Sequence, residues 1–222
     1  MEPLYFDTID STNELAKRMV REGRIRGAAY LVAREQTAGR GSRGRGWVSP
    51  KDAGIYLTIV DLPASASARN TTLFTLATGV ACAEVLREAT GLDVRLKPIN
   101  DLFLEGAKLG GILTEAIVQG DALTALLTGI GINTHLAPRE IGDAAPKADG
   151  APPAQSAPPT SLQEHMPVDA FAHLVMTALL QNLVERATAW HSVVWRGEIS
   201  KIEARWNELR ITGAPECDAL AR

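Results

Sequence analysis

The sequence predicts an α+β fold, in which a mixed, largely antiparallel sheet is flanked by helices. Two apolar runs rich in β-branched residues, 109–118 and 123–132, are separated by the short polar connection Gln119-Gly120-Asp121, as in a β-hairpin. Helices and strands do not alternate along the chain, which disfavours a doubly wound parallel sheet. The length of 222 residues is enough for one hydrophobic core without disulfides or metals.

The first part of the chain predicts a helix and two strands. Ser11-Thr12-Asn13-Glu14 has the pattern of a capping box, and the helix that it starts should reach about Glu22 before Gly23 stops it. Leu15, Ala16, Met19 and Val20 should face inward. Two further apolar segments, 28–33 and 55–60, predict buried strands.

The second part predicts longer helices. Residues 73–89 carry apolar positions at nearly helical spacing, and Gly91 ends that pattern. A short strand is expected at 94–96. Two final helices are expected at about 168–190 and 192–209.

Two segments are expected to contribute little to the core. Residues 137–160 contain six of the twelve prolines, interleaved with alanines, and predict a mobile surface loop. Residues 211–222 predict a frayed tail. One domain should therefore occupy residues 1–210.

Composition limits the classes of partner. The net charge of -3 gives no overall electrostatic attraction to nucleic acid or to an anionic membrane, and we expect neither partner. The N-terminus lacks a signal-peptide pattern, and no apolar run is long enough for a membrane helix. Cys82 is expected to be a buried core thiol and Cys217 lies in the polar tail, so a reducing, cytoplasmic location is expected.

A glycine- and arginine-rich segment, residues 36–47, is the first candidate site. Its four glycines allow close approach of the backbone to a ligand, and its three arginines suit carboxylate or phosphate groups. Trp47 would anchor it. A flexible surface loop explains the composition equally well, and the segment is not a P-loop.

Three further segments carry candidate residues. Lys97 and Lys108 bracket Asn100-Asp101, whose oxygens suit Mg²⁺, although Pro98 and Asn100-Asp101 also fit an ordinary turn. The glycines of 129–133 indicate close packing against the strand, by a ligand or by a helix. Ser11-Thr12-Asn13 fits a helix cap. None of the four histidines has ligand spacing or a neighbouring nucleophile, and none is assigned a role.

Taken together and in order from about Asp10 to Asn133, these segments resemble the catalytic domain of the biotin protein ligases. That family has Ser-Thr-Asn at its first helix, here at 11–13, and Gly-Arg-Gly-x-x-Gly-Arg-x-Trp-x-Ser-Pro, which matches 39–50. It has Lys-Trp-Pro-Asn-Asp and then Lys-Leu-x-Gly-Ile-Leu-x-Glu, similar to 97–101 and 108–115. It ends this region with Gly-x-Gly-Ile-Asn, here at 129–133.

The resemblance implies a biotin/lipoate ligase-like catalytic domain that makes biotinyl-AMP from biotin and ATP with Mg²⁺. The biotin would then pass to a lysine of a biotin carboxyl carrier protein. The implied biotin-binding residues are Ser11, Thr12, Asn13, Gln36, Gly39, Arg40, Lys108 and Gly111. The implied ATP-binding residues are Arg43, Arg45, Trp47, Lys97, Asn100 and Asn133, and the implied metal ligands are Asn100 and Asp101. The implied catalytic residues are Lys108, Arg40 and Arg43.

Some family features are replaced or not found. Serine stands at position 42, where the family often has arginine, and Pro98-Ile99 replaces Trp-Pro. The patterns of the family's C-terminal β-barrel and of its N-terminal DNA-binding extension are not found. The alternatives are a degenerate biotin- or adenylate-binding homologue, a lipoate or octanoate transferase of the same superfamily, and an RNA-binding module. The transferases' Arg-x-Ser-Gly-Gly-Gly type of loop is not present.

Overall fold

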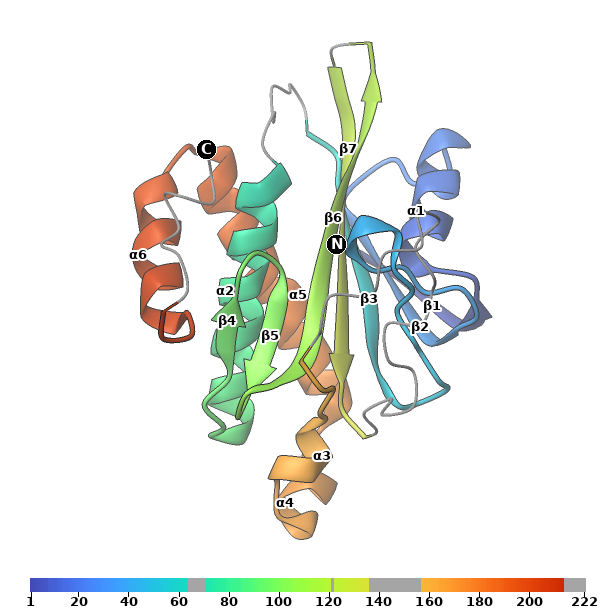
Figure 1. The fold of residues 1–222 in the computed structure, drawn as a ribbon. Helices are drawn as coiled ribbons and strands as arrows, with labels where there is room; N and C mark the ends of the chain where they lie inside the picture. Colours follow the sequence, from blue (N-terminus) through green and yellow to red (C-terminus); the bar gives the residue numbers. More distant parts are fainter. Residues whose placement is uncertain (64–70, 121, 136–156, 214–222) are drawn as a thin grey trace, which may run out of the picture.

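A seven-stranded sheet forms the centre of the structure, a computed structural model that describes residues 1–63, 71–120, 122–135 and 157–213 (Figure 1). The strand order is β1-β2-β3-β7-β6-β5-β4. The strands are β1 (Glu2–Ile9), β2 (Ala29–Gln36), β3 (Gly54–Asp61), β4 (Arg95–Lys97), β5 (Asp101–Leu104), β6 (Ala107–Gln119) and β7 (Ala122–Asn133).

Strand directions confirm the predicted mixed, largely antiparallel sheet. β1 and β2 pair in parallel, and all other neighbouring strands pair antiparallel. β6 and β7 form the predicted hairpin, in which Gln119 lies opposite Ala122.

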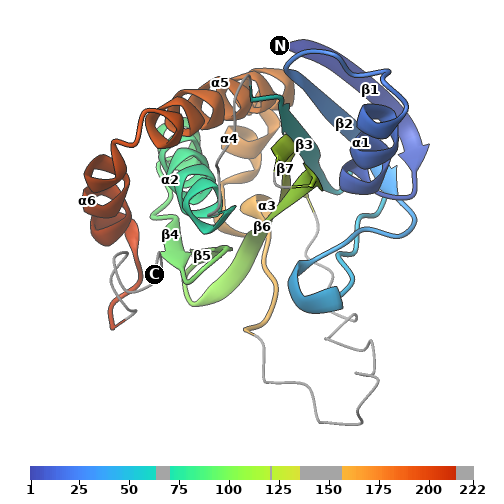
Figure 2. The ribbon, with the colours of Figure 1, turned by 90° about the horizontal axis from the view of Figure 1, so that it is seen from above.

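Helices cover both faces of the sheet, which explains the apolar character of its central strands. Seen from above, α1 (Thr12–Arg21) lies on one side, and α2 (Thr71–Thr90) and α5 (Met176–Trp195) lie on the other (Figure 2). Ala16 and Met19 of α1 are buried against Leu31 and Leu127, and Leu15 and Val20 pack at the edge of this smaller core. The inward face predicted for α1 is therefore confirmed.

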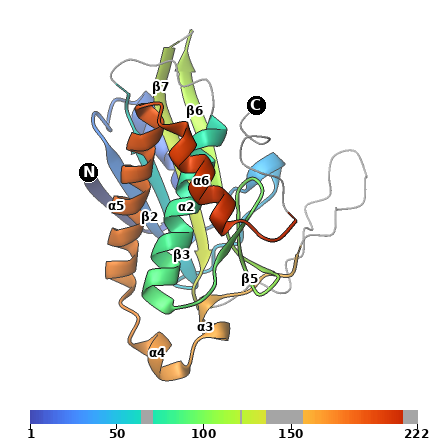
Figure 3. The same cartoon turned by 90° about the vertical axis from the view of Figure 1, so that its left-hand side faces the viewer.

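The larger core surrounds α2, which contacts the sheet, α5 and α6 (Ile199–Leu209) (Figure 3). A Cβ atom on Gly79 would lie 3.2 Å from the ring of Trp206, so α2 and α6 approach closely there. Cys82 lies in this core, and burial raises the pKa of its thiol to about 12. The prediction of a buried core thiol is confirmed, whereas Cys217 lies outside the described residues.

Two strands, β1 and β5, lie where the sequence pattern predicts none. β1 is an edge strand whose residues are exposed or half-buried, so it lacks the apolar run of a central strand. β5 has four residues and directly follows a segment with turn composition. Pairing of β1 with β2, and of β5 with β4 and β6, determines these two strands rather than the local pattern.

The predicted boundaries of the last helices are wrong. In place of one helix over 168–190, α4 (Val168–Ala172) ends before α5 begins at Met176, and α5 continues to Trp195. The turn before α6 contains Gly197 at a φ of +73°, so the second helix begins at Ile199 rather than Ser192. A short helix, α3 (Leu162–His165), precedes α4.

The predicted capping box does not form. Ser11 is the N-cap residue of α1, but its side chain makes no capping hydrogen bond. Glu14, the other half of the box, pairs with Lys17 and Arg40 instead. The hydroxyl of Ser11 therefore does not cap the helix.

The predicted loop and tail are each corrected at one end. Residues 136–156 lie outside the described residues, but 157–160 are described, and Pro158 and Thr160 bond to the backbone of Lys108. In the predicted tail, Ile211 donates its N–H to the carbonyl of Leu96 at 2.9 Å, while 214–222 lie outside the described residues. Among the described residues, no helix combines the length and apolar character that a membrane crossing requires.

Candidate active site

A cavity of about 510 Å³ lies on the sheet where the glycine-arginine loop (residues 39–47) faces the β4–β5 connection and the β6–β7 hairpin. This volume is typical of a small-molecule site. Of the fifteen residues to which the sequence assigned a role, fourteen line the cavity and Gly39 does not. Segments far apart in the chain thus meet at one place.

One end of the cavity is formed by Ser11, Thr12, Asn13 and Gln36, here called the α1 corner. The Oε1 atom of Gln36 accepts hydrogen bonds from the N–H of Thr12 at 2.8 Å and from its hydroxyl at 3.1 Å. The Nε2 atom of Gln36 donates to the hydroxyl of Ser49 at 2.7 Å. The amide of Gln36 is therefore held in one orientation.

Asn13 hydrogen-bonds the α1 corner to two strands, β3 and β6, and packs against a third, β7. Its Oδ1 accepts from the hydroxyl of Thr58 at 2.6 Å, and its Nδ2 donates to the carbonyl of Leu113 at 3.2 Å and to Glu115 Oε2 at 2.9 Å. A Cβ atom on Gly129 would lie 2.6 Å from Asn13 Oδ1, so close packing against this amide requires glycine there. The helix-packing explanation for that glycine holds.

Close packing within the loop explains Gly39 and positions Trp47. A Cβ atom on Gly39 would lie 2.2 Å from the carbonyl oxygen of Trp47, so Gly39 is constrained by the loop itself. The indole of Trp47 lies directly over Gly131 of β7, where a Cβ atom would be 2.5 Å from the ring. A Cβ atom on Gly111 would lie 3.6 Å from the same ring, an ordinary van der Waals distance. Of these two motif glycines, Gly131 is therefore the one that makes room for the Trp47 side chain.

The arginines of the loop differ in their partners. Arg40 forms an ion pair with Glu14 on α1. A hydrogen bond from Lys17, and then the charges of Lys17 and Arg40, lower the pKa of Glu14. Arg43 has a φ of 60° in the short 3₁₀ turn, and Arg45 donates to the hydroxyl of Ser42 at 3.3 Å.

Lys108 provides a partly buried cation at the cavity wall. Its Nζ lies 2.7 Å from Asp101 Oδ1, as an ion pair whose geometry is not that of a hydrogen bond. The same Nζ lies 5.6 Å from the centroid of the Trp47 ring. Side-chain exposures of 20% for Lys108 and 18% for Asp101 mean that water screens this pair only partly.

Asn100, Lys97 and Asn133 complete the predicted set. The Nδ2 of Asn100 donates to the carbonyl of Ile112 at 3.0 Å, and Lys97 Nζ lies 4.8 Å from the centroid of the Phe103 ring. Asn133 Nδ2 donates to the carbonyl of Thr160 at 3.0 Å.

The oxygens of Asn100 and Asp101 fit a magnesium ion, because Mg²⁺ commonly takes one or two protein oxygens together with phosphate oxygens and water. The described residues contain no group of three or more His, Cys, Asp or Glu side chains suited to a metal. Phosphate oxygens and water would complete the coordination of an ion held by Asn100 and Asp101.

Several lining residues escape prediction from the sequence. Thr75 and Thr114 hydrogen-bond to each other at 2.9 Å across the gap between α2 and β6. Phe103, Ala157 and Pro159 also line the cavity. Thr75 interrupts the apolar pattern of α2, but so does Thr78, which does not line the cavity, so the pattern alone does not single out Thr75. The described histidines are not among the lining residues.

Comparison with protein families matches residues 5–133 to the biotin/lipoate A/B protein ligase family. The bifunctional ligase/repressor BirA of Bacillus subtilis (strain 168) is 32% identical over 143 residues, which are 63% of this chain and 42% of that protein. The biotin–[acetyl-CoA-carboxylase] ligase of Paracoccus denitrificans is 37% identical over 141 residues, 63% of this chain and 57% of that protein. The matched region thus spans about half the length of these relatives.

Solved structures share the fold. The biotin protein ligase from Aquifex aeolicus in complex with biotin and ATP has a TM-score of 0.71 at 24% identity, over 95% of this chain and 78% of that one. The ligase from Leishmania major in complex with biotinyl-5-AMP has a TM-score of 0.65 at 22% identity, over 96% and 83% of the two chains. At such identities, the likeness confirms the α+β ligase-type fold alone.

Proposed function

Because the chain belongs to the biotin/lipoate A/B protein ligase family, we propose that it is a biotin protein ligase. It joins biotin to AMP at the expense of ATP, and then transfers the biotin to a lysine of a biotin carboxyl carrier protein. Residues 1–210 form the catalytic domain. We place the reaction in the cytoplasm, where ATP is plentiful.

The main support is the construction of the cavity. A neutral hydrogen-bonding corner at Ser11, Thr12 and Gln36 and a cationic wall around Lys108 line the same cavity of about 510 Å³. Biotin has a neutral, polar ring at one end and a carboxylate at the other, so a cavity with these two surfaces suits both ends. The names of the Bacillus and Paracoccus relatives support the choice of biotin within the family.

The ring of biotin is assigned to the α1 corner. The hydroxyls of Ser11 and Thr12 would hydrogen-bond its ureido group, together with the second N–H of Gln36 Nε2, whose first N–H donates to Ser49. Arg40 and Gly111 would lie beside the ring. Asn13 has a positioning role, because its Oδ1 and Nδ2 atoms already bond to Thr58, Leu113 and Glu115. Gly39 likewise acts through the loop, since it packs against the carbonyl of Trp47.

In the first step, a carboxylate oxygen of biotin attacks the α-phosphorus of ATP, the bond to the bridging oxygen breaks, and pyrophosphate leaves. Two anions must approach each other, so fixed cations lower the barrier. Lys108 would hold the carboxylate and then the α-phosphate. Arg43, Arg45 and Lys97 would hold the phosphates, with Trp47 and Asn133 at the nucleotide.

Magnesium would be held by Asn100 and Asp101 and would neutralise phosphate charge. Lys108, which pairs with Asp101 here, would direct its Nζ to the carboxylate of bound biotin. In the second step, a neutral lysine amine of the carrier attacks the carbonyl carbon of the mixed anhydride, and AMP leaves. Since water would hydrolyse the anhydride, the glycine-arginine loop is expected to cover it.

The proposal is tested by ATP–pyrophosphate exchange with biotin, lipoate and octanoate in parallel. Exchange that depends on biotin, followed by labelling of a carrier protein on its lysine, is the expected result. Exchange that depends on lipoate or octanoate would assign the chain to another branch of the family. Biotin binding without exchange would identify a degenerate binder.

A further inference from the structure

Residues 158–160 run beside Lys108, and Pro159 forms an isolated parallel β-bridge with it. The N–H of Lys108 donates to the carbonyl of Pro158 at 2.8 Å, and the N–H of Thr160 donates to the carbonyl of Lys108 at 2.9 Å. Lys108 also lies opposite Phe103 in β5. The backbone of Lys108 is therefore held between β5 and this segment.

Thr160 connects Lys108 to Asn133, the last residue of the glycine-containing segment 129–133. Its carbonyl accepts the hydrogen bond from Asn133 at 3.0 Å, so one residue bonds to the backbone of Lys108 and to the side chain of Asn133. Thr160 is 3% exposed, and a displacement of this residue would be transmitted to both neighbours.

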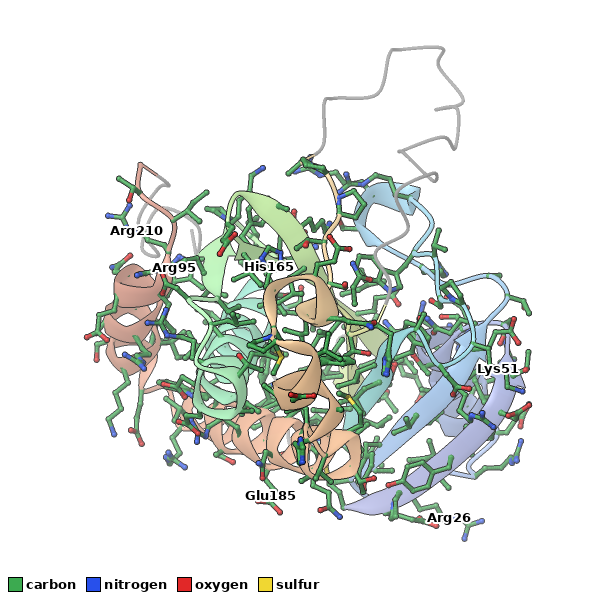
Figure 4. All side chains as sticks on the ribbon, turned by 90° about the horizontal axis from the view of Figure 1, so that it is seen from below. Arg26, Lys51, Arg95, His165, Glu185 and Arg210 are labelled. Atoms are coloured by element: carbon green, nitrogen blue, oxygen red, sulfur yellow. The ribbon has the colours of Figure 1, made fainter. Side chains whose placement is uncertain are left out.

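His165 fixes the side chain of Thr160. Its Nε2 lies 2.6 Å from the hydroxyl of Thr160, and its Nδ1 lies 3.3 Å from Glu105 Oε2 in the β5–β6 turn. When Nδ1 carries the proton directed at Glu105, Nε2 accepts a hydrogen bond from the hydroxyl of Thr160, so a single tautomer serves both contacts. Figure 4 shows His165 between α3 and the hairpin that carries Lys108.

We propose that His165 is a positioning residue for Lys108. The imidazole joins the segment 158–160 to the β5–β6 turn, and both of these flank the backbone of Lys108. His165 does not line the cavity, so it acts through Thr160 rather than on the substrate. The role rests on the proposed function, in which the ammonium group of Lys108 meets the reacting carboxylate.

A loosened Lys108 should reduce the rate more than it reduces binding. Small errors in the placement of a charged group matter most where charge develops in the transition state. Loss of the Thr160 contact should therefore lower kcat, with little change in the KM for biotin.

The test compares two substitutions at one position. His165→Gln retains an amide group near the place of Nε2 that can still hydrogen-bond to the Thr160 hydroxyl, whereas His165→Asn has a side chain too short to reach Thr160. His173→Asn is the matched control, because His173 is an exposed histidine that bonds within α4. The measurements are kcat and KM for biotin in pyrophosphate exchange, the melting temperature, and hydrogen exchange at the amides of Lys108 and Thr160 without ligand.

We expect His165→Asn to lower kcat about tenfold, as loss of one hydrogen bond worth about a factor of ten would do. The KM for biotin should stay within about twofold of the wild type. The Lys108 and Thr160 amides should exchange faster, while His165→Gln and His173→Asn should resemble the wild type.

Equal kcat values for the Asn and Gln variants would overturn the proposal, as would unchanged exchange at the two amides. A loss of activity that only follows a lower melting temperature would also overturn it. If the wild type shows no biotin-dependent exchange, the proposed function fails. In that case, hydrogen exchange at the amides of Lys108 and Thr160 still shows whether His165 holds the backbone of Lys108 in place.

Discussion

The two ends of the cavity are held in different ways. The α1 corner is neutral, with Ser11, Thr12 and Asn13 buried, and hydrogen bonds of Asn13 and Gln36 tie it to strands β2, β3 and β6. The side around Lys108 is charged and partly exposed, and the ion pair Lys108–Asp101 is one of its links. The difference suggests that a fixed corner recognises the neutral ring, while a less constrained charged side handles the anions.

The largest expected effect is on the charged side. Lys108→Ala should lower biotin-dependent pyrophosphate exchange by about 100-fold or more, because a fixed cation near the reacting anions is lost. Fold stability should fall less than activity, because Asp101 loses one ion-pair partner but keeps 18% side-chain exposure and has Lys97 opposite it in β4. The measurement is exchange rate against melting temperature. A variant with nearly normal exchange would contradict the role of Lys108.

Substitutions at two nearby glycines of β7 test the two sides of the cavity separately. Gly129→Ala places a Cβ against the Asn13 amide, and Gly131→Ala places one against the Trp47 ring. We expect Gly129→Ala to cost about 1–3 kcal/mol of unfolding free energy, as overpacking does. Gly131→Ala should cost less stability, because the loop can move, and should instead weaken biotin binding.

Chemical denaturation and isothermal titration with biotin measure these two quantities. The comparison between the two sides fails if Gly131→Ala is the more destabilising substitution, or if both variants lose stability and affinity in the same proportion.

A smaller effect is expected on hydrogen exchange in the glycine-arginine loop. The amides of Gly41 and Trp47 bond to Arg45 and Gly39 within the loop, so opening of the loop exposes them together. We expect them to exchange faster than the amide of Thr12, which bonds to Gln36, and to slow several-fold when biotin is added. Equal protection with and without biotin would argue against a closing loop.

The smallest effect concerns Glu14. Its pKa is lowered chiefly by the hydrogen bond from Lys17, so the ionised form stabilises the fold above its ordinary value of 4.5, and this contribution is lost as the pH falls through the lowered pKa. Glu14→Gln should be less stable than the wild type at pH 7, by under about 1 kcal/mol. The two proteins should converge in acid, as measured by urea denaturation across the pH range. A difference that grows in acid would reverse the sign of this linkage.

Much of the site was predictable because its residues lie in short segments with unusual composition. Arginines between glycines at 39–46 and the pair Asn100-Asp101 stand out from any regular helix or strand pattern. Thr75 and Pro159 did not stand out, since one lies in an apolar helix and the other in a proline-rich segment. His165 lies outside every motif, and its contacts with Thr160 and Glu105 are seen only in the tertiary structure.

The sequence by itself determined the fold class, the β6–β7 hairpin and the segments that supply the cavity, because periodicity, turn chemistry and motif composition are local properties. The tertiary structure decided where β1 pairs, why Gly39, Gly129 and Gly131 must be small, and that Glu14 serves ion pairs rather than a helix cap. It also brought Pro158 and Thr160 beside Lys108 across about fifty positions of chain. These outcomes depend on contacts between residues distant in sequence, and packing settles them only when the whole sheet and its helices have assembled.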